Sequence, residues 1–234
     1  YSSAASDVYK RQEDRYVQVT FGLSQPTLPL IQTLEEQLIY VRGEMQLRNR
    51  PFRIHDLARA ASAYPPNHSR TFPPGALLAR DETFALPGRL LLEDRVSFFR
   101  ELLPYFDDDR FRQVYGEIDV NKPWHDTQNL KAARILVPQF LHPNSPPFYG
   151  TVPTHNREVR VALTHFVGMA GVGPDAPFYR RDDPRAGIFG DPAYRGPTSL
   201  DDVRDGLSNT ILMIQTDSRL AGPWIQGGGA TMRG

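Results

Sequence analysis

Cysteine is missing from this 234-residue chain. Its absence excludes a disulfide framework, a zinc–thiolate site and a cysteine nucleophile, although it leaves the cellular compartment open. An excess of charge of either sign is missing as well, since Lys and Arg total 27 and Asp and Glu also total 27. No net field therefore draws the chain to nucleic acid or to an anionic membrane. No apolar run approaches the ~18 residues that a membrane-spanning helix needs.

Proline and glycine are plentiful instead, with 21 and 18 residues. Both residue types favour long turns and irregular connections. Hydrophobic residues make up 40% of the chain and aromatic residues 11%, which is typical of a globular protein rather than a disordered one. The length suits one large domain, or one domain with a fragment of another.

The N-terminal region is expected to stand apart from the rest. Residues 1–12 (YSSAASDVYKRQ) resemble translated adaptor sequence, so we exclude them from the fold. The sequence begins at a tyrosine and contains no recognisable signal peptide, so we expect the natural start to lie upstream. Residues 13–50 are interpreted as the end of an upstream region followed by a helix. Residues 51–234 are interpreted as one domain that is truncated at its C-terminal side.

Apolar periodicity predicts the first two elements. Residues 15–21 (RYVQVTF) alternate apolar and polar side chains, which indicates a strand. Residues 29–48 carry apolar side chains at intervals of three and four, which indicates a helix. An apolar face continues over residues 52–61, until Tyr64, Pro65 and Pro66 end the helical region.

The middle of the chain is harder to interpret. Residues 95–106 (RVSFFRELLPYF) are strongly apolar and fit either a helix or a strand, with Pro104 limiting a helix. Residues 131–141 predict a short helix followed by a strand that breaks at Pro138.

Two later segments predict strands. Residues 159–169 (VRVALTHFVGM) are rich in β-branched and apolar side chains, and residues 210–216 (TILMIQT) form a short apolar run that is typical of a buried strand. The expected fold class is therefore α+β. We expect a long N-terminal helix packed on an irregular, mainly antiparallel sheet, with long Pro/Gly-rich loops.

The six histidines do not predict a metal or catalytic site. They are His55, His68, His125, His142, His155 and His165. They are scattered, and none forms an H-E-x-x-H pair or a similar ligand spacing. His165 falls inside a predicted strand, where a structural role is the simpler interpretation. We expect no bound metal and no cofactor.

Three further patterns are also weak. The run Asp107, Asp108 and Asp109 lacks the alternating carboxylates and the glycine of a calcium loop, so we interpret it as a solvated turn. Ser208 has no G-x-S-x-G elbow around it. Residues 227–229 (GGG) are not followed by the Lys-Ser/Thr pair of a phosphate loop. None of these patterns predicts catalysis.

A turn in residues 201–216 is the clearer signal. Asp205 and Gly206 lead into Ser208, Asn209 and Thr210, and the predicted strand follows. Glycine supplies a left-handed or tight backbone position, while Ser and Asn side chains bind the backbone of the turn. We therefore expect this turn to set the register of a buried strand, without a ligand.

Several segments, in order, carry a family resemblance. They are residues 60–75 (AASAYPPNHSRTFPPG), 95–105 (RVSFFRELLPY), 121–129 (NKPWHDTQN), 137–146, 164–173 (THFVGMAGVG), 187–190 (GIFG), 204–211 (RDGLSNTI) and 222–224 (GPW). Over about residues 52–234 they resemble the planctomycete prepilin-like family known as domain of unknown function 1559. The R-D-G-x-S-N-T-I motif and the P-W loop are specific when found together.

The resemblance implies a pilin-like domain similar to the pseudopilins of type II secretion. Such a domain lies outside the cytoplasm in the cell envelope, is tethered to the membrane by an N-terminal helix, and acts through other pilin-like subunits or envelope proteins. The sequence departs from the family in three ways. The prepilin signal and its membrane helix are absent, His142 stands where the family often has a cysteine, and the chain stops at Gly234 before a C-terminal family segment.

The resemblance assigns a structural role to the family-motif residues. They are Pro73, Pro74, Pro104, Tyr105, Pro123, Trp124, Gly168, Gly171, Arg204, Asp205, Gly206, Ser208, Asn209, Thr210, Gly222, Pro223 and Trp224. The leading hypothesis is a non-catalytic structural or interaction domain. One alternative is a small-ligand or glycan-binding module that uses exposed Trp124 and Trp224. Another is a hydrolase that uses His125 and Asp126.

Overall fold

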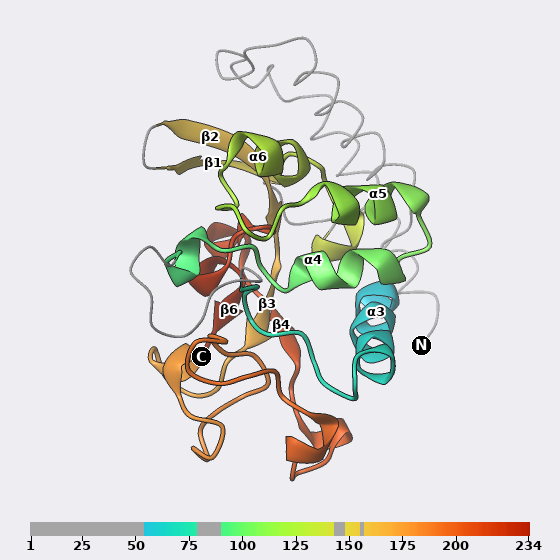
Figure 1. Ribbon diagram of the computed structural model, residues 1–234, viewed down its shortest axis with the longest axis vertical. Coiled ribbons are helices and arrows are strands. Elements are labelled where there is room, and N and C mark those ends of the chain that lie inside the picture. Colours follow the sequence, from blue (N-terminus) through green and yellow to red (C-terminus); the bar gives the residue numbers. More distant parts are fainter. Residues whose placement is uncertain (1–53, 79–89, 143–147, 155–156) are drawn as a thin grey trace, which may run out of the picture. The chain divides into compact units, whose positions relative to one another are not determined.

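The α-helices lie in the first part of the described chain and the strands in the second. The computed structural model describes residues 54–78, 90–142, 148–154 and 157–234 (Figure 1). All of them belong to the second of two compact units, Tyr1–Tyr40 and Val41–Gly234. The order of the elements confirms the α+β class. The predicted strand at residues 15–21 and the helix at residues 29–48 lie outside the described residues.

The bounds of the elements are as follows. The helices are α3 (Ile54–Asn67), α4 (Phe99–Leu102), α5 (Asp109–Glu117) and α6 (Thr127–Ala133). The strands are β1 (Tyr149–Pro153), β2 (Glu158–Thr164), β3 (Phe166–Met169), β4 (Met213–Gln215), β5 (Gly222–Pro223) and β6 (Met232–Arg233). Short 3₁₀ helices connect them at Leu92–Asp94, Leu103–Tyr105, Pro138–Phe140, Ala176–Phe178, Leu200–Asp202, Leu207–Asn209, Ser218–Leu220 and Gly228–Ala230.

Helix α3 buries Leu57, Ala60, Ala61 and Tyr64, which share one face at helical spacing. The predicted end at Tyr64, Pro65 and Pro66 is wrong by a few residues, because both prolines lie inside the helix. Proline's fixed φ is itself helical. The helix ends at Asn67, and Ser69 and Arg70 in the turn after it have positive φ values.

Two aspartates begin the next longer helices. Asp108 caps α5 by accepting a hydrogen bond from the backbone N–H of Arg110, and Asp126 caps α6 by accepting one from Gln128. The predicted solvated side chains are confirmed for Asp107 and Asp109, which are 80% and 93% exposed, but not for Asp108, which is 8% exposed.

The prediction for residues 131–141 is correct only in part. Helix α6 begins at Thr127, ahead of the predicted range, and the strand predicted after it is wrong. Residues Pro138–Phe140 form a 3₁₀ helix instead, in which the N–H of Phe140 donates to the carbonyl of Val137. Proline has no N–H to donate to a strand partner, which favours the tight turn.

The strands form two three-stranded sheets with the orders β1-β2-β5 and β4-β3-β6. All pairs are antiparallel except β3 with β6, so the sheets are mainly antiparallel as expected. The predicted segment 159–169 is confirmed as β2 and β3, with His165 between them. Helix α6 lies over the β1–β2 hairpin, and α3 lies beside α4 (Figure 1).

The prediction of a buried strand at residues 210–216 is wrong. Only Met213–Gln215 form a strand, and Ile211 and Ile214 are 64% and 39% exposed. Strand β4 pairs only with β3 and lies at the edge of its sheet among the described residues. Successive side chains of a strand point to opposite faces of its sheet, and Ile214 lies on a face that remains partly open to solvent.

Aromatic rings from distant segments meet in the core. Phe98 lies against Phe99 and Phe189, with ring centroids 4.4 and 4.1 Å apart. Phe140 lies 4.4 Å from Phe99 and 5.8 Å from Trp224. The cluster therefore joins α4, the 3₁₀ helix Pro138–Phe140, the loop that carries Phe189 and the residue after β5 around one interior.

Candidate functional site

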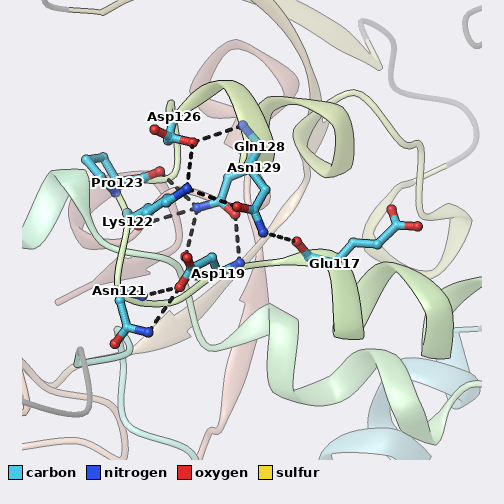
Figure 2. Close-up of polar contacts among 8 residues, drawn as sticks. All are labelled: Glu117, Asp119, Asn121, Lys122, Pro123, Asp126, Gln128 and Asn129. Carbon is cyan, nitrogen blue, oxygen red and sulfur yellow. Dashed lines mark hydrogen bonds and ion pairs between the residues drawn. The ribbon is translucent and has the colours of Figure 1, made fainter.

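The loop between α5 and α6 is organised by a single buried amide. Asn129 in α6 is fully buried, and its Nδ2 donates to the carbonyls of Asp119 and Pro123, each at 2.9 Å. Its Oδ1 accepts a hydrogen bond from the N–H of Asp119 at 2.9 Å. Figure 2 shows the loop wrapped around this side chain. The Asn of the family's P-W loop therefore fixes the backbone of the loop.

Both tryptophans are buried, so their predicted exposure is wrong. Trp124 is 2% exposed, and its Nε1 donates to the carbonyl of Glu93 at 2.9 Å. Trp224 is 0% exposed, and its Nε1 donates to the carbonyl of Ile135 at 3.0 Å. A large apolar ring with a satisfied N–H stabilises the folded chain most when it is buried. The ring faces proposed to bind a glycan are not accessible.

His125 and Asp126 serve different partners. The Nε2 of His125 donates to the carboxylate of Asp94 at 3.2 Å, while Asp126 accepts from the N–H of Gln128 at 2.9 Å. General acid–base catalysis needs the two groups within reach of one reacting proton. The contacts of this pair instead fix the loop and the start of α6.

The other described histidines also have structural surroundings. The ring of His68 stacks on that of Tyr64, with centroids 3.8 Å apart and planes 2° apart. His165 is fully buried, and its Nδ1 accepts a hydrogen bond from the N–H of His142 at 2.9 Å. His55 is exposed, and His155 lies outside the described residues. Within the described part of the chain, no three His, Asp or Glu side chains are grouped as metal ligands.

The structure contains a buried ion pair that the sequence did not predict. The Nη1 of Arg95 lies 2.8 Å from the Oδ1 of Asp191, and the two side chains are 3% and 6% exposed. Arg95 also donates from Nε and Nη2 to the carbonyl of Leu90. The available signal was a charged residue at the start of the apolar segment 95–106. Its partner is 96 residues away along the chain, which no local pattern indicates.

The turn around Gly206 forms as predicted, but on the surface. Gly206 has φ 82°, the Nδ2 of Asn209 donates to the carbonyl of Asp205 at 2.8 Å, and the Oγ1 of Thr210 donates to the carbonyl of Gly206 at 3.0 Å. Arg204 and Ser208 are exposed. The turn is therefore held by its own side chains, and the strand that follows it is the exposed β4.

Glycines of the family motifs allow close packing. A Cβ on Gly168 would overlap the ring of Phe189, and one on Gly171, where φ is 139°, would overlap the carbonyl of Arg185. A Cβ on Gly222 would lie 3.0 Å from the carbonyl of Ala230. These positions favour glycine because neighbouring groups occupy the space of a side chain.

The remaining motif residues also lie in the scaffold. Pro73 is buried and Pro74 half-buried, next to the fully buried Ala76. Pro104 and Tyr105 belong to the 3₁₀ helix Leu103–Tyr105. Pro123 offers its carbonyl to Asn129, and Pro223 pairs with Leu163 in the first sheet. The structure does not bring the motif residues together in one cleft.

An apolar groove lies between α3 and residues 207–213. Its volume is about 610 Å³, and its lining includes Leu57, Pro65, Phe72, Ile188, Leu207 and Ile211. Leu207 and Ile211 are 53% and 64% exposed, and β4 continues from the groove with the exposed Ile214. Exposed apolar side chains that gather in a groove are typical of interaction surfaces.

Among the described residues, no helix is both long enough and apolar enough to cross a membrane. Comparison with curated proteins and with solved structures gave no match. Comparison with protein families gave a match over residues 53–233, which are more than half of the chain. This match and the ordered motifs agree, and the chain belongs to the family described as Protein of unknown function (DUF1559).

Proposed function

We propose that this chain is a non-catalytic, pilin-like interaction domain that is exposed outside the cytoplasm. Its apolar groove and the adjoining edge of β4 would receive a second copy of the same chain. The observation that carries the proposal is the exposure of Leu207 and Ile211 in the groove and of Ile214 in β4, whose outer edge pairs with no other strand among the described residues. The family resemblance supports a role in assembly.

The polar contacts support a non-catalytic role. Asn129, Asp126 and Asp108 bind backbone groups of the loops and helix ends around them. His125 is engaged by Asp94. A reactive group would instead need to face a space that a substrate can enter. The histidine and carboxylate that suggested a hydrolase therefore give it no support.

The position of β4 at a sheet edge supports the choice of a second copy as the partner. An antiparallel strand can pair with the same strand of another molecule about a two-fold axis, so that each copy offers the same surface. Ile211 of each copy would then be covered together with the edge of β4 that faces away from β3. Net charge is zero, so long-range repulsion between copies is weak.

The test is the oligomeric state of the 234-residue chain and two variants, measured by sedimentation equilibrium over a range of concentrations. We expect a reversible dimer, and Ile211→Lys should weaken it by about tenfold or more, because a lysine would have to be desolvated in the interface. Val172→Lys is the matched control, since Val172 is 69% exposed in another loop. A chain that stays monomeric, or equal effects of the two variants, would contradict the proposal.

The location outside the cytoplasm has its own test. This sequence contains no cysteine, so Leu91→Cys, at a position 64% exposed, adds a single thiol to it. We expect a membrane-impermeant maleimide to label this thiol in the natural full-length protein when the outer barrier of the cell is opened and the inner membrane is intact. Labelling only after lysis of the inner membrane would place the domain in the cytoplasm.

A further inference from the structure

A second, polar pocket is separate from the apolar groove. Its volume is about 710 Å³, and four arginines line it, Arg180, Arg181, Arg195 and Arg204. Three aspartates and Tyr194 complete the wall. We call this the arginine pocket. The sequence did not indicate it, because its arginines are spread over residues 180–204 without a recognisable spacing.

Each aspartate of the arginine pocket already forms an ion pair with an arginine. The pairs are Arg180 Nε with Asp182 Oδ1 at 3.2 Å, Arg181 Nη1 with Asp202 Oδ2 at 2.7 Å, and Arg70 Nη2 with Asp201 Oδ1 at 2.9 Å. Arg70 is not part of the lining. Two lining arginines, Arg195 and Arg204, therefore remain without a carboxylate partner in the part of the chain that the structure describes.

Arg195 is the more unusual of the two, because it is only 5% exposed. Its Nη2 donates to the carbonyls of Ala170, at 3.0 Å, and Phe189, which are neutral groups. Burial lowers the pKa of Arg195, and the nearby Arg181 cation lowers it further. A buried cation without a counter-ion is costly, so an anion in the pocket would stabilise it.

Arg181 is held in place before any ligand binds. Its Nη2 donates to the carbonyls of Gly196 and Pro197 at 2.8 and 2.7 Å, in addition to the ion pair with Asp202. A guanidinium that is already fixed loses little conformational entropy when it binds an oxyanion. The exposed Arg204 supplies a second, accessible cation at the rim.

We propose that the arginine pocket binds a small organic anion through its carboxylate, sulfate or phosphate group. The guanidinium of Arg195 neutralises the anionic group from the wall of the pocket, and Arg204 binds it from the solvent side. The exposed ring of Tyr194 offers an apolar surface for the body of the ligand. This site goes beyond the assembly role of the apolar groove.

The test is titration calorimetry of the 234-residue chain with sodium sulfate, sodium glucuronate and glucose, at an ionic strength kept constant with sodium chloride. We expect binding of sulfate or glucuronate and none of glucose. Binding of glucuronate alone would identify carboxylates as the ligands, and binding of sulfate would identify tetrahedral anions. If neither anion binds, the proposal is wrong.

Variants separate the pocket from general surface charge. Arg204→Gln should weaken anion binding by about tenfold, the effect of losing a charged hydrogen bond. Arg219→Gln removes an equally positive side chain that is 87% exposed and paired with Asp217, and it should leave binding unchanged. Arg204 is exposed, so its replacement should not disturb folding. Equal weakening by the two variants would show that the anion binds without using the pocket.

Discussion

Asn129 is the side chain on which the loop between α5 and α6 depends. Its donors and acceptor engage the backbone of Asp119 and Pro123 in a place that water does not reach. Buried backbone groups are costly when they lose their partners. The same loop carries Trp124 into the core, so the amide also positions that ring.

Replacing Asn129 by alanine should therefore destabilise the fold. We expect Asn129→Ala to lower the free energy of unfolding by about 2–4 kcal/mol, since it leaves several buried groups unpaired. Asn209→Ala is the matched control, because Asn209 is exposed and its side chain donates one hydrogen bond within the described part of the chain, to the carbonyl of Asp205. Its effect should stay below about 1 kcal/mol. Urea unfolding measures both, and equal losses would argue against the loop contacts as the cause.

Tyr64 should make stability depend on pH in the alkaline range. Burial raises the pKa of its phenol, and the carboxylate of Glu101 adds to the rise. The folded chain therefore keeps the proton at a pH where an unfolded tyrosine, with a pKa of about 10, has lost it. The contribution to stability is complete below pH ~10 and is lost as the pH rises further.

The Tyr64→Phe variant tests this dependence. Above pH ~10 its free energy of unfolding should fall less steeply than that of the unmodified chain, because phenylalanine has no proton to lose. Tyr194→Phe serves as the control, since Tyr194 is 60% exposed. Urea unfolding at several alkaline pH values gives the slopes. If Tyr64→Phe and the unmodified chain lose stability in parallel, burial of this phenol is not the cause.

At the scale of elements, replacing each of two glycines in regular structure by alanine should change the stability of the fold in opposite directions. Gly168 in β3 faces the ring of Phe189, so Gly168→Ala should destabilise by about 1–3 kcal/mol through overpacking. Gly116 in α5 has free space around it, and Gly116→Ala should stabilise by about 0.5–1 kcal/mol through helix propensity. Thermal unfolding distinguishes the two, and effects of the same sign would contradict the packing around β3.

The periodicity of apolar residues predicted the positions of the strands better than it predicted their burial. Residues 159–169 form β2 and β3, because β-branched side chains favour a strand whichever face of the sheet they lie on. The run at residues 210–216 was misinterpreted because a buried strand and an exposed edge strand share the same apolar composition. Which of the two forms depends on neighbours, and β4 has β3 on one side and no strand of the described residues on the other.

The candidate sites depend on contacts that sequence spacing does not show. The sequence predicted that the P-W loop is structural. It did not show that Trp124 points inward, where its Nε1 donates a hydrogen bond to the carbonyl of Glu93, 31 residues earlier. The ion pair of Arg95 with Asp191 and the arginine pocket join segments whose charges look like ordinary surface residues in the sequence. A charge becomes informative only when its burial and partners are known.

At the scale of the whole molecule, the nature of the proposed self-association predicts its response to salt. The groove is lined mainly by apolar side chains, pairing at the β4 edge uses uncharged backbone groups, and the net charge is zero. We expect the dimer to be as tight or tighter when sodium chloride rises from about 50 mM to about 500 mM, since screening weakens ionic contacts but not apolar ones. Sedimentation equilibrium at the two concentrations measures this. Dissociation at high salt would indicate an ionic interface in another place.

The last strands have a consequence for how the protein is made. Strands β5 and β6 pair with β2 and β3, and Trp224, Ile225 and Met232 are almost fully buried. A ribosome synthesises these residues after the described α-helices, α3 to α6, so the interior of the nascent chain is incomplete until they appear. Folding should then finish only after residues 222–233 leave the exit tunnel, and a chaperone that covers apolar surface would be most useful in that interval.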